Sequence, residues 1–206
     1  MDIRPKLIIL ESPDGLGKST QASLLFNRFY PEAKLISQPS DDNVIGFIRS
    51  SVKDPNTNWT AMERQMLISL SHCVDAFTCF DSSTNIIMDR SYISGLVYGK
   101  LTNAPEDKMK TLINCLKAVY TYNIALKYDV YVIIFDAKNR FNKTSHDFFE
   151  TQTKWENLRD FYLEIPKLGF FFSPDEKISI VNVEGKSVFD IHKEIIEVIE
   201  GKGEIK

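Results

Sequence analysis

Residues 6–21 form the stretch that most restricts what this chain can fold into. A short apolar run, KLIIL at residues 6–10, leads into a turn of small residues, and GKST at residues 17–20 then opens an amphipathic pattern. A strand, a glycine-containing loop and a helix in this order are the context of a phosphate-binding loop. Glycines let consecutive backbone N–H groups point at phosphate oxygens, and the helix N-terminus adds partial positive charge. The stretch therefore predicts an α/β domain that binds a nucleotide.

The side chains of this loop suit a nucleoside triphosphate with a divalent cation. Lys18 would bridge the outer phosphates, and the Ser19 hydroxyl would take a coordination position on Mg²⁺. The usual pattern, G-x-x-x-x-G-K-[ST], begins with a glycine where this chain has Ser12, which is small enough to leave the turn possible. The loop residues expected to contact the nucleotide are Asp14, Gly15, Leu16, Gly17, Lys18, Ser19 and Thr20.

Five strand-like runs alternate with helical patterns along the chain. The runs cover residues 6–10, 34–37, 85–90, 129–135 and 177–183. Such alternation predicts an α/β fold with three layers, in which helices cover both faces of a five-stranded, mostly parallel sheet. Because no repeat, low-complexity tract or linker divides the sequence, we expect a single domain over residues 1–206.

A long helix is predicted from Thr60 to about Asp81. Thr60 is its expected N-cap, because Glu63 follows at the spacing of a capping box. Apolar side chains recur on one side of this helix, as is typical of an amphipathic segment. They are Met66, Leu67, Leu70, Val74 and Phe77.

Asp89 and Arg90 close the third strand, at the edge of the sheet where ligands of parallel α/β folds bind. A carboxylate at the end of an apolar strand is costly unless it is paired or binds a metal, so Asp89 is a candidate Mg²⁺ partner. Its alternative role is to cap the next helix. Arg90 offers a permanently charged, planar group for a phosphate, and its alternative is a salt bridge to Asp89 or Glu11.

A polar and basic loop is predicted over about residues 137–150, after the fourth strand. Arg140, Lys143 and His146 are spaced three apart in this loop. Phosphoryl transfer depends on charge neutralisation, and a cationic lid would provide it. The alternative interpretation is a solvated surface loop that happens to be basic.

The bulk properties exclude several classes of protein. A net charge of −3 and a pI of 5.7 argue against a large nucleic-acid surface, although a local cationic cluster can still bind small anions. No apolar run reaches the roughly 20 residues of a membrane span, and no secretory leader is recognisable. Cys73, Cys79 and Cys115 lack metal-type pairing, so we expect reduced core thiols and a cytoplasmic location.

Several segments resemble thymidylate kinases. Residues 11–21, ESPDGLGKSTQ, are similar to the family's opening motif E-G-x-D-x-x-G-K-[ST]-T-Q. Residues 89–98, DRSYISGLVY, look like its D-R-Y-x-x-S-G-x-A-Y segment, and residues 147–150, DFFE, resemble the D-R-[FY]-E that closes its lid. Residues 183–187 match where the family places an adenine-contacting loop. The resemblance spans nearly the whole chain.

The resemblance implies a P-loop kinase fold that transfers the γ-phosphate of ATP to dTMP, with Mg²⁺ and without a covalent intermediate. It implies that Lys18 binds ATP, that Ser19 and Asp89 bind the metal, and that Arg90 binds the acceptor phosphate. Asp14 would hold the sugar hydroxyl or orient the acceptor.

The remaining implied roles concern the lid, the adenine and the assembly. Because Gly15 stands where one class of these kinases carries a loop arginine, Arg140 of the lid is expected to supply that cation. Arg140 and Lys143 would then contact ATP, and Gly185 would lie at the adenine. A homodimer is also implied, and the helix at residues 60–81 is the candidate surface.

Several positions depart from the family pattern around the acceptor. Asp41 replaces an arginine that binds phosphate, and His72 replaces a second arginine. Ile68 stands at the base-stacking phenylalanine, and Phe148 replaces the arginine of the lid motif. Charge-assisted hydrogen bonds contribute roughly 1.5–3 kcal/mol each, so other cations would have to compensate. The candidates are Arg49, Arg64 and Lys100.

Three functions remain open from the sequence. The leading hypothesis is a nucleoside monophosphate kinase for dTMP. The second hypothesis is a kinase for another monophosphate or for a nucleoside. A nucleoside acceptor would require a base near the strand end, such as Glu11 or Asp89. The third hypothesis is a nucleotide-binding module without kinase activity. A GTPase switch is not favoured, because NKTS at residues 142–145 lacks the aspartate of the N-K-x-D guanine motif.

Overall fold

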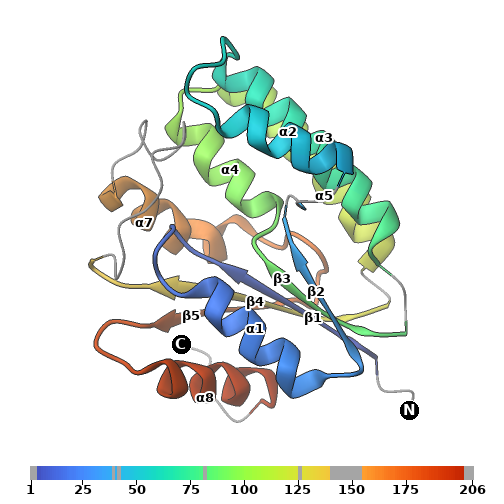
Figure 1. The fold of residues 1–206 in the computed structure, drawn as a ribbon, viewed down its shortest axis with the longest axis vertical. Helices are drawn as coiled ribbons and strands as arrows, with labels where there is room; N and C mark the ends of the chain where they lie inside the picture. The colour runs from blue at the N-terminus through green and yellow to red at the C-terminus, as the bar shows by residue number, and fades with distance from the viewer. Residues whose placement is uncertain are drawn as a thin grey trace.

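The computed structural model describes residues 4–38, 40, 43–80, 83–124, 127–139 and 155–201. Its centre is a five-stranded sheet in the order β2-β3-β1-β4-β5, and every neighbouring pair is parallel. The strands are β1 (Lys6–Glu11), β2 (Ala33–Ser37), β3 (Asn85–Asp89), β4 (Asp129–Asp136) and β5 (Lys177–Asn182). The expected strands and the α/β architecture are thus confirmed (Figure 1).

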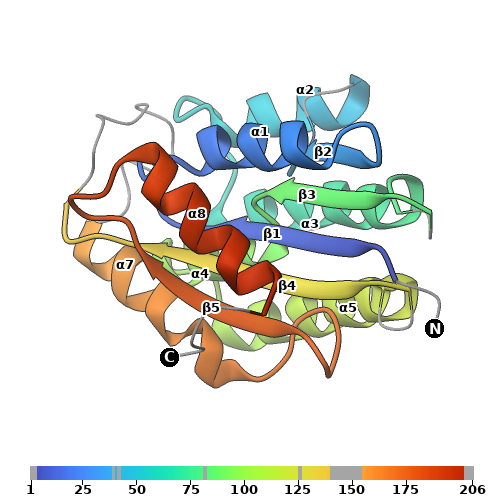
Figure 2. The ribbon, with the colours of Figure 1, turned by 90° about the horizontal axis from the view of Figure 1, so that it is seen from below.

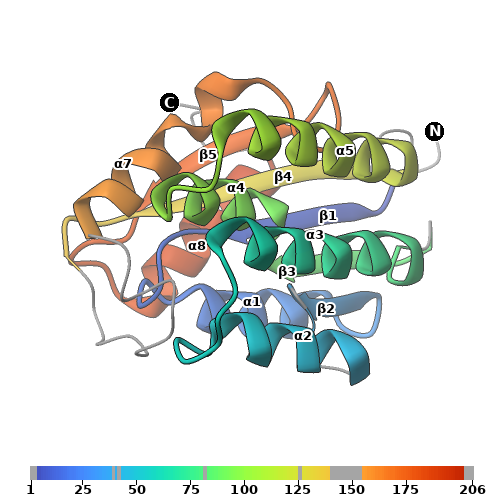
Figure 3. The same cartoon turned by 90° about the horizontal axis from the view of Figure 1, so that it is seen from above.

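Helices cover both faces of this sheet. One face carries α1 (Lys18–Phe29) and α8 (Val188–Ile199), and Figure 2 shows α8 lying across the strands on this side. Figure 3 shows the opposite layer, whose helices dominate that view. Its members are α2 (Asn43–Lys53), α3 (Ala61–Thr78), α4 (Tyr92–Leu101), α5 (Glu106–Ile124) and α7 (Trp155–Glu164), which continues into a short 3-10 helix at Ile165–Leu168.

The central strand β1 shows how the sequence builds two cores. Successive side chains of a strand point to opposite faces of the sheet. Leu7 and Ile9 accordingly enter the core under α3, α4 and α5, whereas Ile8 and Leu10 enter the core under α1 and α8. All four side chains are fully buried, which explains why the strand reads as a continuous apolar run rather than an alternating one.

The element boundaries agree closely with the expected ones where the structure describes them. The capping box at Thr60 and Glu63 is present, and α3 ends at Thr78 rather than near Asp81. Helix α7 is described from Trp155 to Glu164. No helix among the described residues has both the length and the apolarity that a membrane crossing needs.

The cysteines correct one expectation. All three are free thiols, but Cys73 and Cys79 are half-buried and Cys115 is exposed, so none is a core residue. Cys73 and Cys79 pack against one core from its edge, and the helical periodicity around them does not reveal that outward rotation.

Candidate functional site

The glycine loop joins β1 to α1 and takes the conformation that its glycines permit. Gly15 and Gly17 have φ angles of 86° and 81°, a region that other residues rarely adopt. Ser12, which replaces the usual first glycine, is not among the residues with positive φ and is completely buried. Leu16 packs its side chain into the core beneath α1 and α8, which anchors the loop to the sheet. Any contact from Leu16 to a ligand would therefore come from its backbone.

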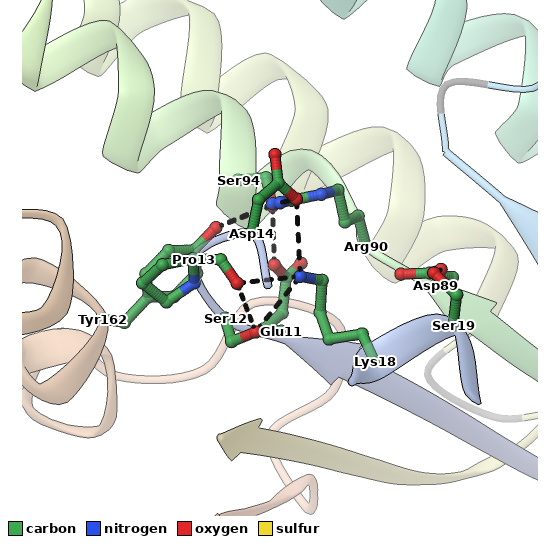
Figure 4. Close-up of polar contacts among 10 residues, drawn as sticks. All are labelled: Glu11, Ser12, Pro13, Asp14, Lys18, Ser19, Asp89, Arg90, Ser94 and Tyr162. Atoms are coloured by element: carbon green, nitrogen blue, oxygen red, sulfur yellow. Dashed lines mark hydrogen bonds and ion pairs between the residues drawn. The ribbon is translucent and has the colours of Figure 1, made fainter. Parts of the chain in front are cut away.

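Lys18 lies folded against this loop with only 5% of its side chain exposed. Its Nζ atom donates to the Pro13 carbonyl oxygen at 3.0 Å and to Ser12 Oγ at 3.1 Å, and it lies 3.7 Å from Asp14 Oδ1 (Figure 4). Burial, helped by the nearby Arg90 cation, lowers the pKa of Lys18 to about 8. An ammonium held this way is ready to exchange its loop contacts for phosphate oxygens.

Ser19 and Asp89 meet at the start of α1 and the end of β3. Ser19 Oγ donates to Asp89 Oδ2 at 2.5 Å, and both residues line the same cavity. Oxygen ligands of this kind suit Mg²⁺, which usually keeps several waters and takes only one or two protein carboxylates besides substrate phosphates. The described residues hold no cluster of three or more His, Cys, Asp or Glu side chains able to form an all-protein metal cage. The pair therefore fits a magnesium that is shared with a nucleotide.

Arg90 follows β3 in a left-handed backbone conformation, with φ of 71°. Its backbone N–H donates to the Leu10 carbonyl at 3.0 Å, which fixes the strained residue to the sheet edge. Its guanidinium forms an ion pair with Asp14, and Nη1 donates to Ser94 Oγ at 2.8 Å and to the Tyr162 hydroxyl at 3.1 Å. Backbone strain of this kind persists only where the surroundings determine it, and it is typical of functional sites.

The charges of Asp14 and Arg90 are set by one another. Burial alone would raise the pKa of the Asp14 carboxyl, but the Arg90 and Lys18 cations hold it well below its usual range. Asp14 is consequently an anion at any physiological pH. It orients Arg90 from one side, while helices α4 and α7 supply Ser94 and Tyr162 from the other (Figure 4).

Glu11 lies behind this cluster with no exposed surface. Its two carboxylate oxygens accept hydrogen bonds from Ser91 Oγ at 2.5 Å and Ser94 Oγ at 2.7 Å. Burial raises the pKa of Glu11, although both hydrogen bonds and the Arg90 and Lys18 charges oppose that effect. Arg90 thus pairs with Asp14 directly, whereas Glu11 supports it through Ser94.

A cavity of about 260 Å³ at the carboxyl ends of the strands is shared by Lys18, the Ser19–Asp89 pair, and Asp14 with Arg90. Its walls come from the glycine loop, the ends of β2 and β3, and helix α2. The described residues that line it are Asp14, Gly15, Gly17, Lys18, Ser19, Thr20, Ser37, Gln38, Arg49, Lys53, Asp89 and Arg90. Most of the expected loop residues are therefore brought together with Asp89 and Arg90.

Other expected residues lie elsewhere. Gly185 lies in the loop before α8 and does not line the cavity. Helix α8 itself is joined to α1 by a hydrogen bond from Gln21 Nε2 to the Val188 carbonyl at 2.8 Å. Ile68 is part of a buried core cluster. Asp41, Arg140, Lys143, His146 and Phe148 lie outside the described residues.

His72 belongs to a buried network beside the cavity. The side chain is 2% exposed, and its Nδ1 atom lies 3.2 Å from Gln38 Oε1. The Gln38 amide also bonds the Tyr120 hydroxyl at 2.8 Å and Asp75 at 3.1 Å. Burial lowers the pKa of His72 to about 3, so the ring is neutral and does not replace the positive charge of an arginine.

Sequence reasoning missed several contributors to the site, among them Tyr162 and Lys53. Tyr162 reaches Arg90 from a helix 72 residues further along the chain, and no local pattern indicates such a contact. Lys53 lines the cavity together with Arg49, four residues earlier on α2. That spacing places both cations on one face of the helix, which is the signal that could have identified the pair.

The comparison with known proteins agrees with this geometry. The family model described as thymidylate kinase matches residues 10–195. The chain belongs to the thymidylate kinase family. Two curated relatives share 24% identity with it: a probable thymidylate kinase of Methanococcus maripaludis over 203 residues, and the thymidylate kinase of Helicobacter pylori over 199 residues. These alignments cover 94% of this chain, and 94% and 97% of the two relatives.

Solved structures of thymidylate kinases share the fold. The enzyme of Candida albicans superposes with a TM-score of 0.71 at 24% identity, covering 96% of this chain and 92% of that one. The enzyme of Ehrlichia chaffeensis gives 0.68 at 15% identity, with 96% and 100% covered. The P-loop kinase fold expected for the thymidylate kinase family is therefore confirmed.

Proposed function

We propose that this protein is a nucleoside monophosphate kinase that transfers the γ-phosphoryl group of ATP to dTMP, releasing ADP and dTDP. The observation that carries the proposal is the shared cavity, which joins Lys18, the Ser19–Asp89 pair and Arg90 in a member of the thymidylate kinase family. The curated relatives are named thymidylate kinases, which supports dTMP as the acceptor. Phosphoryl transfer of this type needs positioning and charge neutralisation rather than covalent chemistry.

On the donor side, the glycine loop and Lys18 would bind the outer phosphates of ATP. Lys18 Nζ donates to the Pro13 carbonyl and the Ser12 hydroxyl, so only a local exchange of hydrogen-bond partners is needed. Ser19 and Asp89 would hold Mg²⁺, which neutralises charge on the β- and γ-phosphates. Arg140 and Lys143 of the lid would add cations at the same phosphates, and Gly185 would contact the adenine.

On the acceptor side, Arg90 would contact the phosphate of dTMP while Asp14 orients it. The acceptor oxygen is an anionic phosphate oxygen, so no base is required for its attack on the γ-phosphorus. A nucleoside hydroxyl would require one, and the geometry disfavours both candidates. Glu11 is fully buried behind Ser94, and Asp89 accepts a hydrogen bond from Ser19.

ADP release from ATP and Mg²⁺ tests the function directly, measured with dTMP, dUMP, thymidine and the other monophosphates. We expect turnover on dTMP and a loss of about 100-fold or more in a Lys18→Ala variant, since one cation at the transferred group is removed. Turnover on another monophosphate would reassign the base pocket. ATP binding without phosphorylation of any acceptor would replace the kinase with a binding module.

The assembly and location complete the proposal. Helix α3 exposes Met66, Leu70, Val74 and Phe77, with 55%, 55%, 41% and 65% of each surface accessible. An exposed apolar stripe of this kind marks an interaction surface. An isologous homodimer would cover this stripe of α3. Three free thiols fit a reducing cytoplasm, where nucleotide kinases find their substrates.

A further inference from the structure

The guanidinium of Arg90 is held at three of its five N–H groups. Nη1 donates to Ser94 Oγ at 2.8 Å and to the Tyr162 hydroxyl at 3.1 Å, and Nη2 donates to Asp14. An arginine carries one further N–H on Nε and a second one on Nη2. No hydrogen bond to another described residue occupies these two groups, and Arg90 lines the cavity. They are therefore the N–H groups that a ligand would use.

The directions of the hydrogen bonds around Nη1 follow from a count of the protons. Ser94 Oγ donates its only proton to Glu11 Oε2 at 2.7 Å. The same oxygen lies 2.9 Å from the Tyr162 hydroxyl, so Tyr162 is the donor in that pair (Figure 4). Tyr162 thus donates to Ser94, and Ser94 donates to Glu11. Arg90 donates to both hydroxyls, which closes a small ring of hydrogen bonds.

Tyr162 keeps the proton that this ring requires. Its side chain is almost fully buried, and burial raises its pKa to about 13, although the Arg90 cation opposes that effect. A phenolate could not donate to Ser94. The hydroxyl therefore stays a donor to Ser94 and an acceptor from Arg90 at any pH at which the protein works.

Helix α7 holds Tyr162 in place independently of its hydroxyl. Leu158, Tyr162 and Ile165 recur at helical spacing and are buried in the core that α3, α4 and α5 cover. One turn before the tyrosine, Arg159 binds Asp136 at the end of β4 through two hydrogen bonds of 2.6 and 3.0 Å. Because packing and this ion pair fix the helix, removing the hydroxyl should leave the ring where it is.

Two other cations suggested by the sequence do not contribute here, which makes the orientation of Arg90 more important. Arg64 donates to backbone carbonyls of residues 52–57. Lys100 Nζ lies 4.1 Å from the centre of the Phe161 ring, in a cation–π contact. Neither residue is among the described residues that line the cavity.

We propose that Tyr162 is a positioning residue for phosphoryl transfer. Its hydroxyl, together with Ser94, fixes Nη1 of Arg90, so that the N–H groups on Nε and Nη2 are presented to the acceptor phosphate in one orientation. The inference rests on the proposed kinase function and adds a residue that lies outside every motif of the sequence. Tyr162 acts through Arg90 and does not touch the substrate.

Steady-state kinetics of Tyr162→Phe test this role, with ATP and dTMP varied separately, or with another monophosphate if that is the acceptor. We expect kcat/KM for the acceptor to fall about tenfold, because the guanidinium is no longer held in one orientation. KM for ATP should stay within about twofold of the wild type. Tyr131→Phe is the matched control: it removes a buried tyrosine hydroxyl on β4 that contacts only Lys177 Nζ, at 3.4 Å, and should change neither value.

A double-mutant cycle with Arg90→Lys shows whether Tyr162 acts through Arg90. A lysine has no counterpart of Nη1, so Tyr162→Phe should change the remaining kcat/KM by less than about twofold in that background. A tenfold fall in both backgrounds would overturn the proposal, because the tyrosine would then act by another route. An unchanged kcat/KM in the Tyr162→Phe single variant would also overturn it.

Nitrogen-15 NMR of the Arg90 guanidinium gives a readout that does not need turnover, with the signals assigned by their loss in Arg90→Lys. Partners on both Nη1 protons slow the rotation about the Cζ–Nη1 bond. We expect faster rotation in Tyr162→Phe and no change in Tyr131→Phe. If rotation changes in this way but no monophosphate is phosphorylated, the kinase function fails and the positioning contact stands. If rotation is the same in Tyr162→Phe and the wild type, the positioning role is overturned whatever the substrate is.

Discussion

Ser12 shows how a single residue can depart from a motif and still preserve its geometry. The position does not need a positive φ, so a side chain is tolerated there. The hydroxyl donates to the Pro13 carbonyl at 2.7 Å and accepts from Lys18 Nζ at 3.1 Å. The substitution therefore adds a hydrogen-bond acceptor for the lysine of the loop.

The state of Lys18 leads to a prediction on pH dependence. Burial lowers its pKa to about 8, whereas an ordinary lysine stays charged up to about pH 10. A lowered pKa means that the cation is lost earlier as pH rises, and the neutral amine no longer attracts phosphate. We expect kcat/KM for ATP to fall as the pH rises through about 8. A profile that stays flat to about pH 9.5 would contradict it.

In Ser12→Ala, the fall of kcat/KM for ATP at alkaline pH (the alkaline limb of the pH profile) should begin at a lower pH, because the Ser12 hydroxyl stabilises the charged form of Lys18. The matched control is Ser23→Ala, which removes a hydroxyl that only bonds the Ser19 carbonyl on the surface of α1. A limb that moves equally in both variants would show that Ser12 acts on the helix and not on the lysine.

At the scale of elements, α3 shows why periodicity alone is incomplete. Its capping box at Thr60 could be predicted, and so could the apolar stripe. Nevertheless Met66, Leu70, Val74 and Phe77 are exposed, while the helix buries Arg64, Gln65, Ser71, His72 and Asp75. For two of these buried residues the partners lie far away in the sequence: Gln38 donates to Asp75 and contacts His72 Nδ1, and the Tyr120 hydroxyl donates to the His72 carbonyl. A hydrophobic pattern cannot report partners of this kind, because they exist only after folding.

Because His72 of α3 is buried, we expect the stability of the fold to decrease at acid pH. Its pKa is about 3 when folded, against about 6.5 when unfolded, so between these values the unfolded chain binds the extra proton. Stability is therefore lost as the pH falls below about 6.5, by on the order of 2 kcal/mol at pH 5 from this group alone. Urea unfolding at pH 7.5 and pH 5 should show a smaller acid loss in His72→Gln than in the wild type. Equal losses would mean that His72 does not titrate on unfolding.

In the whole molecule, the sheet and the glycine-loop side of the cavity were predictable, whereas the α2 side was indicated only by Arg49 and its four-residue spacing to Lys53. Apolar runs ending in Asp89 and Arg90 were enough to place those residues beside the glycine loop, since parallel strands end at one edge. The contribution of Arg49 and Lys53 depends on how α2 is rotated against α3, which the packing of both helices fixes. The family motifs do not indicate that Arg49 and Lys53 line the cavity, because these two cations are not part of any motif.

The outward stripe of α3 gives the last prediction, which concerns assembly. If two chains pack through Met66, Leu70, Val74 and Phe77, light scattering should give about twice the 23.7 kDa of one chain. Leu70→Glu should yield monomers, because a two-fold axis would bring two buried charges close together without partners. Phe189→Glu is the matched control: it changes an exposed apolar residue on α8, on the other face of the sheet, and should leave the dimer intact. A wild-type monomer, or a dimer that survives Leu70→Glu, would place the interface elsewhere, and the stripe would then need another partner to cover it.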